Sequence, residues 1–340
     1  MKTFAALFLF LPTLAFGQSF FEGALFATHV SESGPVEPRN EVFSTNWFTA
    51  GVERAIGDHG SMTFRIRGSL EPLTIKREGY PQLLQFISIG SGGPLEDAMR
   101  AHDLLGEVAV DLRYRALHLY VAPVGEPPLG PGPFERRASS TEFAEGSFNY
   151  DVAEGWRHAT RVIGAGFQTG IFQLDGGVFH EAVTFDRHTS LEDGSIDSWS
   201  ARAVIAPTPD VELQVSHGAL GDAKEKVTSA SLSKTTNKLA LSALWTRRGQ
   251  RNAYGAEATA HLGRSVVMGR AEQIDKRIHV TVGYIFDVIA REQWRAGVGA
   301  NVDYHTKTHE LGSRYGHKPQ GVYLFARVRG TTRRASLSTP

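Results

Sequence analysis

Alternation of apolar and polar residues, repeated along most of the chain, is the feature that most constrains how this sequence folds. Residues 61–70 read SMTFRIRGSL, and an extended strand points successive side chains to opposite faces. One face is apolar and the other polar: Met62, Phe64, Ile66 and Leu70 against Thr63, Arg65 and Arg67. A soluble sheet buries its apolar face, whereas a membrane barrel turns that face to lipid and encloses the polar one.

The same period of two recurs in many segments of strand length, among them 107–114, 198–206, 211–216, 278–286 and 322–329. Convincing amphipathic helical periodicity is absent from the sequence outside its first residues. The sequence therefore disfavours an α/β enzyme scaffold and predicts an all-β fold.

The connections between these segments alternate in length. The short ones are rich in turn-forming residues: 56–60, 115–116, 207–210, 235–237 and 262–264. The long ones lie between the strand pairs: 72–103, 125–160, 182–195, 218–226 and 305–320. Short periplasmic turns and long extracellular loops are the rule for outer-membrane barrels. An opening strand near 20–30, seven hairpins and a last strand at 322–329 predict an antiparallel transmembrane β-barrel of about 16 strands, within a range of 14–18.

The first residues have the pattern of a secretory signal peptide. Lys2 precedes the apolar run FAALFLFLPTLAF, and Ala15 and Gly17 supply the small residues before a cut at Gln18. The predicted organisation is a signal peptide at 1–17, a barrel at 18–330 and a C-terminal tail at 331–340. The signal predicts export across the inner membrane, a location in the bacterial outer membrane, and outer-membrane lipid as a partner. A secreted soluble sandwich or propeller remains the alternative, although no blade repeat is visible.

Composition narrows the possible partners and sites. Acidic and basic residues balance at 36 each, which predicts no nucleic-acid partner. Cysteine is absent, so thiolate metal sites and cysteine nucleophiles are excluded. The thirteen histidines include no HExxH motif, and His305 and His309 lie four apart in a predicted loop. We therefore predict no metal and no cofactor, and we interpret GSGG (90–93) as a loop tip and not a phosphate loop.

Five stretches carry a family resemblance: LYVAPVGEPPLGPGPFERRASS (119–140), GYPQLLQ (79–85), DSWSAR (197–202), LQVSHGAL (213–220) and VYLFARVRG (322–330). Over nearly the whole mature chain, the sequence resembles a group of uncharacterised, porin-like bacterial outer-membrane β-barrel proteins. The resemblance implies a barrel and no specific chemistry. Members of the group tend to carry more histidines in the long loops, where this chain keeps only His102 with Asp103, and His158.

Two sets of charged residues are the candidate functional groups. Charges that project from the polar strand faces are predicted to line the lumen: Arg65, Arg67, Glu107, Asp111, Arg113, Arg202 and Glu212, with Asp303. The proline-rich stretch after residue 122 is predicted to form a stiff loop, which either narrows the lumen or stays at the surface. Its candidate constriction residues are Glu126, Glu135, Arg136 and Arg137.

The function predicted from these features is a non-enzymatic, porin-like channel for passive diffusion or uptake of small hydrophilic solutes. One alternative is a closed barrel with a plugged lumen and a structural or surface-interaction role. The other is an outer-membrane hydrolase, for which the strand residues Ser198, Ser200, Ser216, His118 and His217 would be available, although no G-x-S-x-G elbow is present. The solute, the openness of the lumen and the oligomeric state stay undetermined by the sequence.

Overall fold

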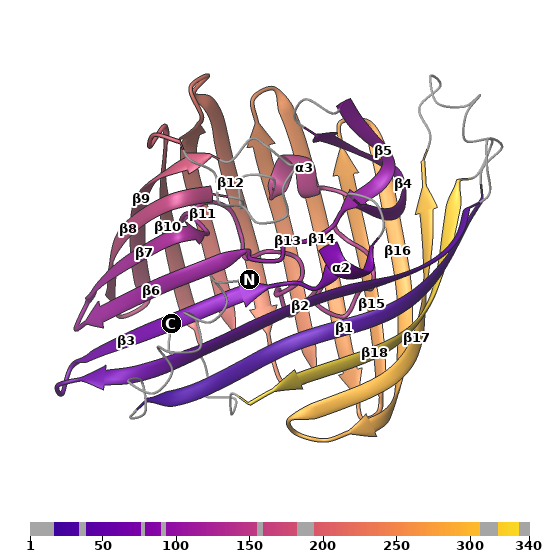
Figure 1. Ribbon diagram of the computed structural model, residues 1–340, viewed down its shortest axis with the longest axis horizontal. Helices are drawn as coiled ribbons and strands as arrows, with labels where there is room; N and C mark the ends of the chain where they lie inside the picture. The colour runs from indigo at the N-terminus through magenta and orange to yellow at the C-terminus, as the bar shows by residue number, and fades with distance from the viewer. Residues whose placement is uncertain are drawn as a thin grey trace.

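The computed structural model describes residues 17–33, 39–75, 79–89, 93–154, 159–181, 194–306 and 319–332 (Figure 1). The strands in this part of the chain are β1 (Gln18–Ser33), β2 (Arg39–Ile56), β3 (Gly60–Gly68), β4 (Gly79–Ile89), β5 (Gly93–Arg100), β6 (Glu107–Tyr114), β7 (Leu117–Gly125), β8 (Ala159–Thr169), β9 (Phe172–Glu181), β10 (Ser198–Thr208), β11 (Val211–Leu220), β12 (Glu225–Thr235), β13 (Leu239–Arg248), β14 (Arg251–Leu262), β15 (Ser265–Ile274), β16 (Arg277–Ala290), β17 (Trp294–His305) and β18 (Gln320–Thr331). Two short helices are α2 (Glu71–Thr74) and α3 (Tyr150–Ala153). Neither of them is long enough to cross a bilayer, and no other described helix qualifies. The predicted signal peptide lies almost wholly outside the described residues, as does most of the predicted tail.

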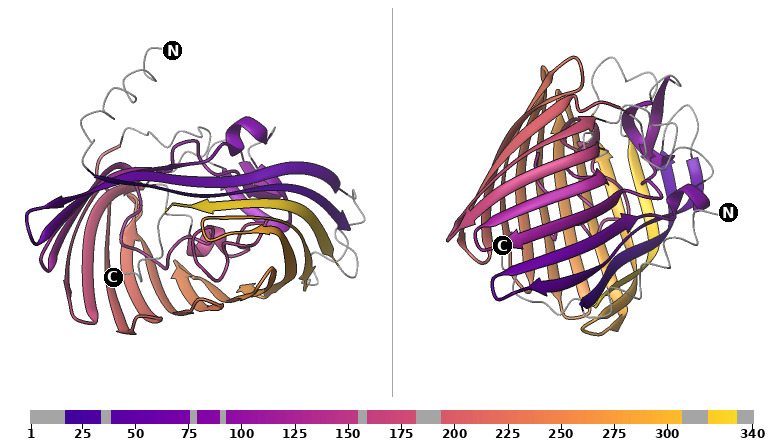
Figure 2. Two further views of the ribbon diagram at one scale, coloured as in Figure 1. Left: turned by 90° about the horizontal axis from the view of Figure 1, so that it is seen from below. Right: turned by 60° about the vertical axis from the view of Figure 1, so that its left-hand side comes forward.

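Sixteen of the strands close into one antiparallel barrel, as the sequence predicts (Figures 1 and 2). Each barrel strand pairs with its neighbour in the sequence except at two places. The first strand pairs with the last, with Ala27 opposite Ala326, which closes the barrel. Strand β3 pairs with β6, because β4 and β5 form a separate two-stranded sheet. Closure leaves no free sheet edge in the barrel, which a structure within hydrocarbon requires.

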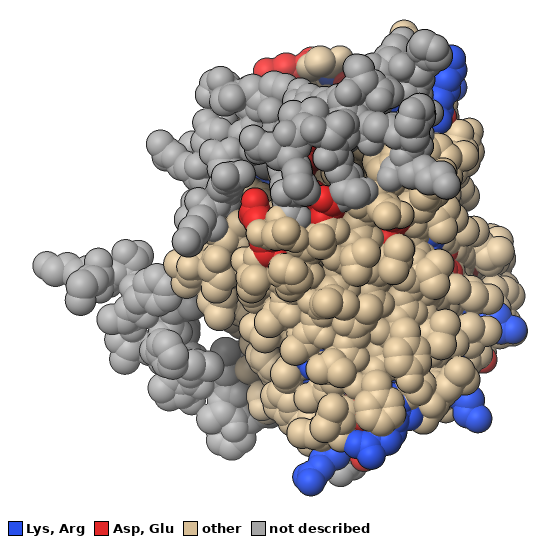
Figure 3. All heavy atoms as spheres, turned by 90° about the vertical axis from the view of Figure 1, so that its right-hand side faces the viewer, with Lys and Arg blue, Asp and Glu red and all other residues tan. Residues whose placement is uncertain are grey.

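The register settles which face of each strand points inward. On β3, Ile66 lies opposite Val108 on the outside, whereas Arg67 lies opposite Glu107 and both are buried. The exposed face of β16 is wholly apolar: Val280, Val282, Tyr284, Phe286 and Val288. Figure 3 shows a broad face with few charges between charged upper and lower margins. The apolar face of the alternation therefore forms the exterior and the charged face the interior.

Exposed aromatic residues form two girdles near the ends of the strands. We call the end that carries the turns 57–59, 115–116 and 170–171 the short-turn rim, and the opposite end the long-loop rim. The first girdle lies near the short-turn rim: Tyr114, Phe167, Phe172 and Trp294. The second lies near the long-loop rim: Trp199, Tyr254 and Tyr304. Aromatic girdles at both interfaces are typical of membrane barrels.

Two predicted long loops differ from the structure. The segment 218–226 is a tight turn, because β11 runs to Leu220 and β12 begins at Glu225, and Gly221 takes the positive φ of +59° that the turn needs. The segment 72–103 contains most of helix α2 and the whole β4–β5 hairpin. The alternation of β4 is interrupted where the register shifts between Pro81 and Phe86, so the sequence gives a weak strand signal there. Residues 90–92 of the GSGG stretch lie outside the described residues, and Gly93 begins β5.

A charge introduced on the exterior should cost far more than one introduced toward the lumen. Val215 is 56% exposed on the outer face of β11, while Ser231 on the adjacent β12 points inward and donates to Gln214 at 3.0 Å. We expect Val215→Arg to lower the free energy of unfolding by about 2–4 kcal/mol, because it places a charge in hydrocarbon near mid-strand. Ser231→Arg, at a similar depth, should lower the free energy of unfolding by only about 1 kcal/mol, because it removes the hydrogen bond to Gln214. Urea titration of protein folded in lipid vesicles measures both, and equal losses would contradict the assignment of faces.

Candidate functional site

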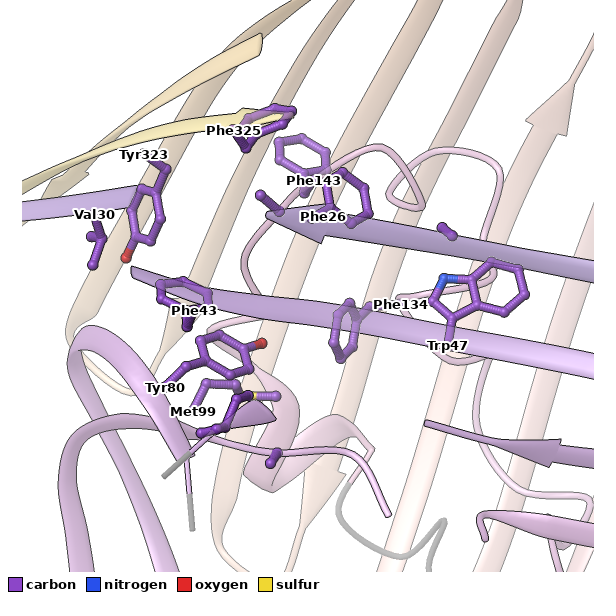
Figure 4. Close-up of a cluster of buried hydrophobic side chains, with 14 of the residues drawn as sticks. Phe26, Val30, Phe43, Trp47, Tyr80, Met99, Phe134, Phe143, Tyr323 and Phe325 are labelled. Atoms are coloured by element: carbon purple, nitrogen blue, oxygen red, sulfur yellow. The ribbon is translucent and has the colours of Figure 1, made fainter. Parts of the chain in front are cut away.

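An apolar core lies inside the barrel on the side of β18, β1 and β2 (Figure 4). Phe26 of β1 packs edge-on against Phe325 of β18, with ring centroids 5.6 Å apart. Phe43 of β2 stacks on Tyr80 of the β4–β5 hairpin, with centroids 4.9 Å apart. The core is completed by aromatic residues of the β7–β8 link, Phe134 and Phe143. This part of the lumen is filled with packed side chains.

The β7–β8 link runs inside the barrel, and we call its residues 126–154 the inner segment (Figure 1). The amide of Gly130 donates to Ser216 of β11 at 2.8 Å. Across the lumen, Thr45 of β2 donates to the carbonyl of Ala144 at 3.0 Å. The inner segment therefore spans the barrel from one wall to the other, and of the two predicted positions it takes the internal one.

Arg137 anchors the inner segment to the wall. Its guanidinium contacts Glu154 of the same segment and Glu257 of β14, each at 2.6 Å. Ser139 adds a bond to Glu257 at 2.9 Å. Burial by itself lowers the pKa of Arg137, but the two carboxylates outweigh it and hold the pKa above its ordinary value. Arg137, one of the predicted constriction residues, is thus a buried cation held between two carboxylates.

Further anchors join the inner segment to the inner faces of the later strands. Glu142 pairs with Arg327 of β18 and, at 2.9 Å, with Arg329. Glu145 accepts a hydrogen bond from Asn301 at 2.5 Å and pairs with Arg270 at 3.3 Å. Burial, with a smaller contribution from Asp303, raises the pKa of Glu145 to about 7. These buried ion pairs fix the segment in one position.

The other three predicted constriction residues, Glu126, Glu135 and Arg136, lie close together. Glu126 accepts from Arg67 of β3 at 2.6 Å and pairs with Arg136, whose guanidinium is 3.6 Å from Glu135. Burial lowers the pKa of Arg136, but the nearby carboxylates, Glu126 first, raise it overall. A cavity of about 60 Å³ is lined by Arg67, Glu126 and Glu135 together with His102.

A larger cavity of about 220 Å³ lies between the prolines of the inner segment and the wall formed by β3 and β6–β10. Five of the predicted lumen residues line it: Arg65, Glu107, Asp111, Arg113 and Arg202. Of the other predicted residues, Arg67 belongs to the smaller cavity. Glu212 lies exposed beside the short-turn rim, and Asp303 is buried at the long-loop end of β17. The strand charges are thus divided among four environments.

The charges around the larger cavity occur as pairs of opposite sign. Arg65 forms two bonds to Glu107 at 3.0 and 2.9 Å, and Tyr120 donates to the same carboxylate at 2.8 Å. Arg202 pairs with Asp175 of β9 at 2.8 Å. Such pairing predicts a polar surface without a dominant sign of charge.

Solved structures show what kind of barrel this is. No protein family matches the sequence, and no curated protein matches it. A triple mutant of the porin of Rhodopseudomonas blastica matches over 92% of this chain and 100% of its own, with a TM-score of 0.51 and 9% identity. This chain has the fold of a porin. A double mutant and a second triple mutant of the same porin cover the same shares, each at 8% identity and a TM-score of 0.50. At such identity the likeness concerns the fold alone.

Several residues of this porin-fold lumen are not among those predicted to line it. His118 and Asp175 both line the larger cavity, 3.6 Å apart. They approach across Gly166 of β8, where an added Cβ would lie 2.3 Å from the histidine ring. The available signal is a glycine that lies between two polar residues of the neighbouring strands. This signal can be recognised only when the register of the strands is known. Glu142, Glu145 and Glu154 carry no such signal, because they lie in a link without periodicity.

The porin-fold barrel separates the residues considered for a hydrolase. Ser216 points inward and accepts from Gly130, whereas the adjacent His217 is exposed on the outside and bonds to Thr228 at 2.8 Å. Ser198 donates to Asp197 at 2.6 Å. The hydrogen bonds of these residues, where the structure describes them, therefore serve the barrel and do not form a serine–histidine pair.

Proposed function

We propose that this protein is an outer-membrane channel that lets small hydrophilic solutes pass between the inner segment and the wall formed by β3 and β6–β10. The observation that carries the proposal is the cavity of about 220 Å³ on that side, lined by paired charges and by the prolines of the inner segment. Barrels of this size enclose an aqueous channel when nothing fills them, and the inner segment leaves this space open between its prolines and the wall.

The outer-membrane location is supported by three features. The exterior is apolar, two aromatic girdles flank it, and residues 1–17 have the pattern of a signal peptide. The long-loop rim would then face the cell exterior and the short-turn rim the periplasm. On that orientation the larger cavity lies toward the periplasm, because Asp111, Arg113 and His118 lie near the short turn 115–116.

Single-channel recording in planar bilayers tests the channel and its lining together. The paired charges predict small discrete steps and a reversal potential near zero in a potassium chloride gradient. Arg202→Glu places a second carboxylate beside Asp175, so the reversal potential should shift toward cation preference. Lys238→Glu is the matched control, because Lys238 is exposed in the turn 236–238 at the short-turn rim. This change should leave the reversal potential unchanged. An equal response to both changes would remove the cavity from the conducting path.

A closed barrel is the second candidate, and the packing of the inner segment favours it. The segment buries aromatic residues against β1, β2 and β18, and it is held by buried ion pairs on several strands. A closed barrel with a structural or surface-interaction role predicts no discrete steps from folded wild-type protein. Steps that appear only after the segment is removed would decide for this second candidate.

A further inference from the structure

A group of potential metal ligands lies on the inner face of β16 and β17, away from the cavity described above. His279 of β16 stands directly opposite His305 of β17, and the next inward pair along the strands is Thr281 and Asp303. One ligand atom from each of His279, Asp303 and His305 lies within 4.8 Å of the others, and all three residues are buried. Sequence reasoning missed this set because it considered His305 with His309, four residues away, and not with the residue opposite it on the next strand.

His305 is buried without satisfying its polar atoms. Its relative exposure is 1%, and neither ring nitrogen has a hydrogen-bond partner among the described residues. Its ring stacks on that of His279, with centroids 4.4 Å apart. Buried polar groups without partners are rare in folded proteins, because burial removes their bonds to water. A bound metal ion, which accepts the lone pair of a ring nitrogen, would satisfy the residue.

The surrounding hydrogen bonds orient the other two residues as metal ligands. The Nδ1 atom of His279 lies 3.2 Å from Glu272, and Thr281 donates to Oδ1 of Asp303 at 2.9 Å. These contacts involve Nδ1 of the histidine and Oδ1 of the aspartate. Nε2 of His279 and Oδ2 of Asp303 face each other at 3.3 Å, and the same Nε2 lies 3.2 Å from the hydroxyl of Thr281. A carboxylate behind the distal nitrogen of a ligating histidine is the usual outer shell of a metal site.

The charge of this region also suits a cation. The buried carboxylates Glu145 and Glu272 both contact Arg270, and the buried Asp303 faces His279. Phe148 of the inner segment covers the histidines, with its ring centroid 5.3 Å from that of His279 and 5.7 Å from that of His305. Carboxylates gathered in such a dry position would stabilise a bound divalent cation.

We propose that His279, Asp303 and His305 bind one divalent transition-metal ion of the Zn²⁺ class, with Glu272 orienting His279. Ligands 2.0–2.1 Å from a tetrahedral ion lie about 3.3 Å from one another, which is the present separation of His279 and Asp303. His305 would have to move by at most about 1.5 Å, a change within reach of a side-chain rotation. Three protein ligands leave a fourth position for water or another donor. The proposal does not depend on the proposed channel function.

Binding of Zn²⁺ to the full-length mature protein in detergent, after treatment with a chelator, tests the site. We expect one Zn²⁺ per chain by calorimetry, and a tetrahedral visible absorption band when Co²⁺ replaces it. Asp303→Asn and His305→Gln should each abolish the band or weaken binding at least tenfold, and Glu272→Gln should weaken it by about 10–100-fold. His118→Gln is the control, because His118 is also an inward histidine beside an aspartate but has no third ligand among the described residues.

A folded barrel migrates differently before and after boiling on a denaturing gel. Retention of this heat-dependent gel shift shows that each variant is folded. Wild-type protein that binds no Zn²⁺ and gives no Co²⁺ band overturns the proposal, whether or not the variants fold. Binding that survives unchanged in folded Asp303→Asn and His305→Gln proteins overturns it as well. A loss of binding in His118→Gln equal to that in His305→Gln would place the ion elsewhere.

Discussion

Replacing residues 126–158 by an Asn-Gly turn should raise the single-channel conductance several-fold. Gly125 and Ala159 are neighbours across β7 and β8, so a two-residue turn joins the strands without moving the barrel. The replacement removes the inner segment with its aromatic residues and its ion pairs, and a barrel of 16 strands without a plug encloses a wide aqueous channel. Recording in planar bilayers measures the change.

The shortened protein should be less stable, because Phe26, Trp47 and Phe325 lose their covering and face water. Conductance is therefore recorded on protein that still shows the heat-dependent gel shift of a closed barrel. A conductance equal to that of the wild type in such protein would show that the inner segment does not limit the passage.

Arg137→Met should destabilise the protein by about 3–5 kcal/mol, the cost of removing one partner from a buried ion pair. The Arg137 side chain is 7% exposed and lies between two carboxylates, Glu154 and Glu257, each of them 1% exposed. Its loss leaves these two negative charges near each other in a dry environment. Urea titration of protein in lipid vesicles measures the stability, and noisier channel currents should accompany the released segment.

Arg136→Met is the matched control, because the two arginines are adjacent in the chain but differ in environment. The Arg136 side chain is 22% exposed and pairs with Glu126, which is 25% exposed, so its replacement should cost about 1 kcal/mol or less. It should instead shift ion preference toward cations, since Glu126 and Glu135 remain. Similar stability losses in both variants would show that Arg137 is not the main anchor.

The barrel itself was determined by the sequence. A period of two over segments such as 107–114 and 278–286 fixes which side chains share a face, because successive residues of a strand point in opposite directions. Turn-forming residues then fix where a strand ends. The number of strands follows from these local rules, and the structure confirms it. The same rules place Arg65, Arg67 and Glu107 on one face of their strands, where Arg67 lies opposite Glu107.

What fills the barrel was decided only by the tertiary structure. The links 72–103 and 126–154 have no period, so the sequence could not show that one forms a hairpin and the other crosses the lumen between Ser216 and Thr45. The adjacent residues Arg136 and Arg137 are alike in sequence, and only the position of Glu257 makes the second an anchor. Likewise His279 and His305 meet through the register of β16 and β17, because pairing between strands depends on closure of the whole barrel and not on either segment alone.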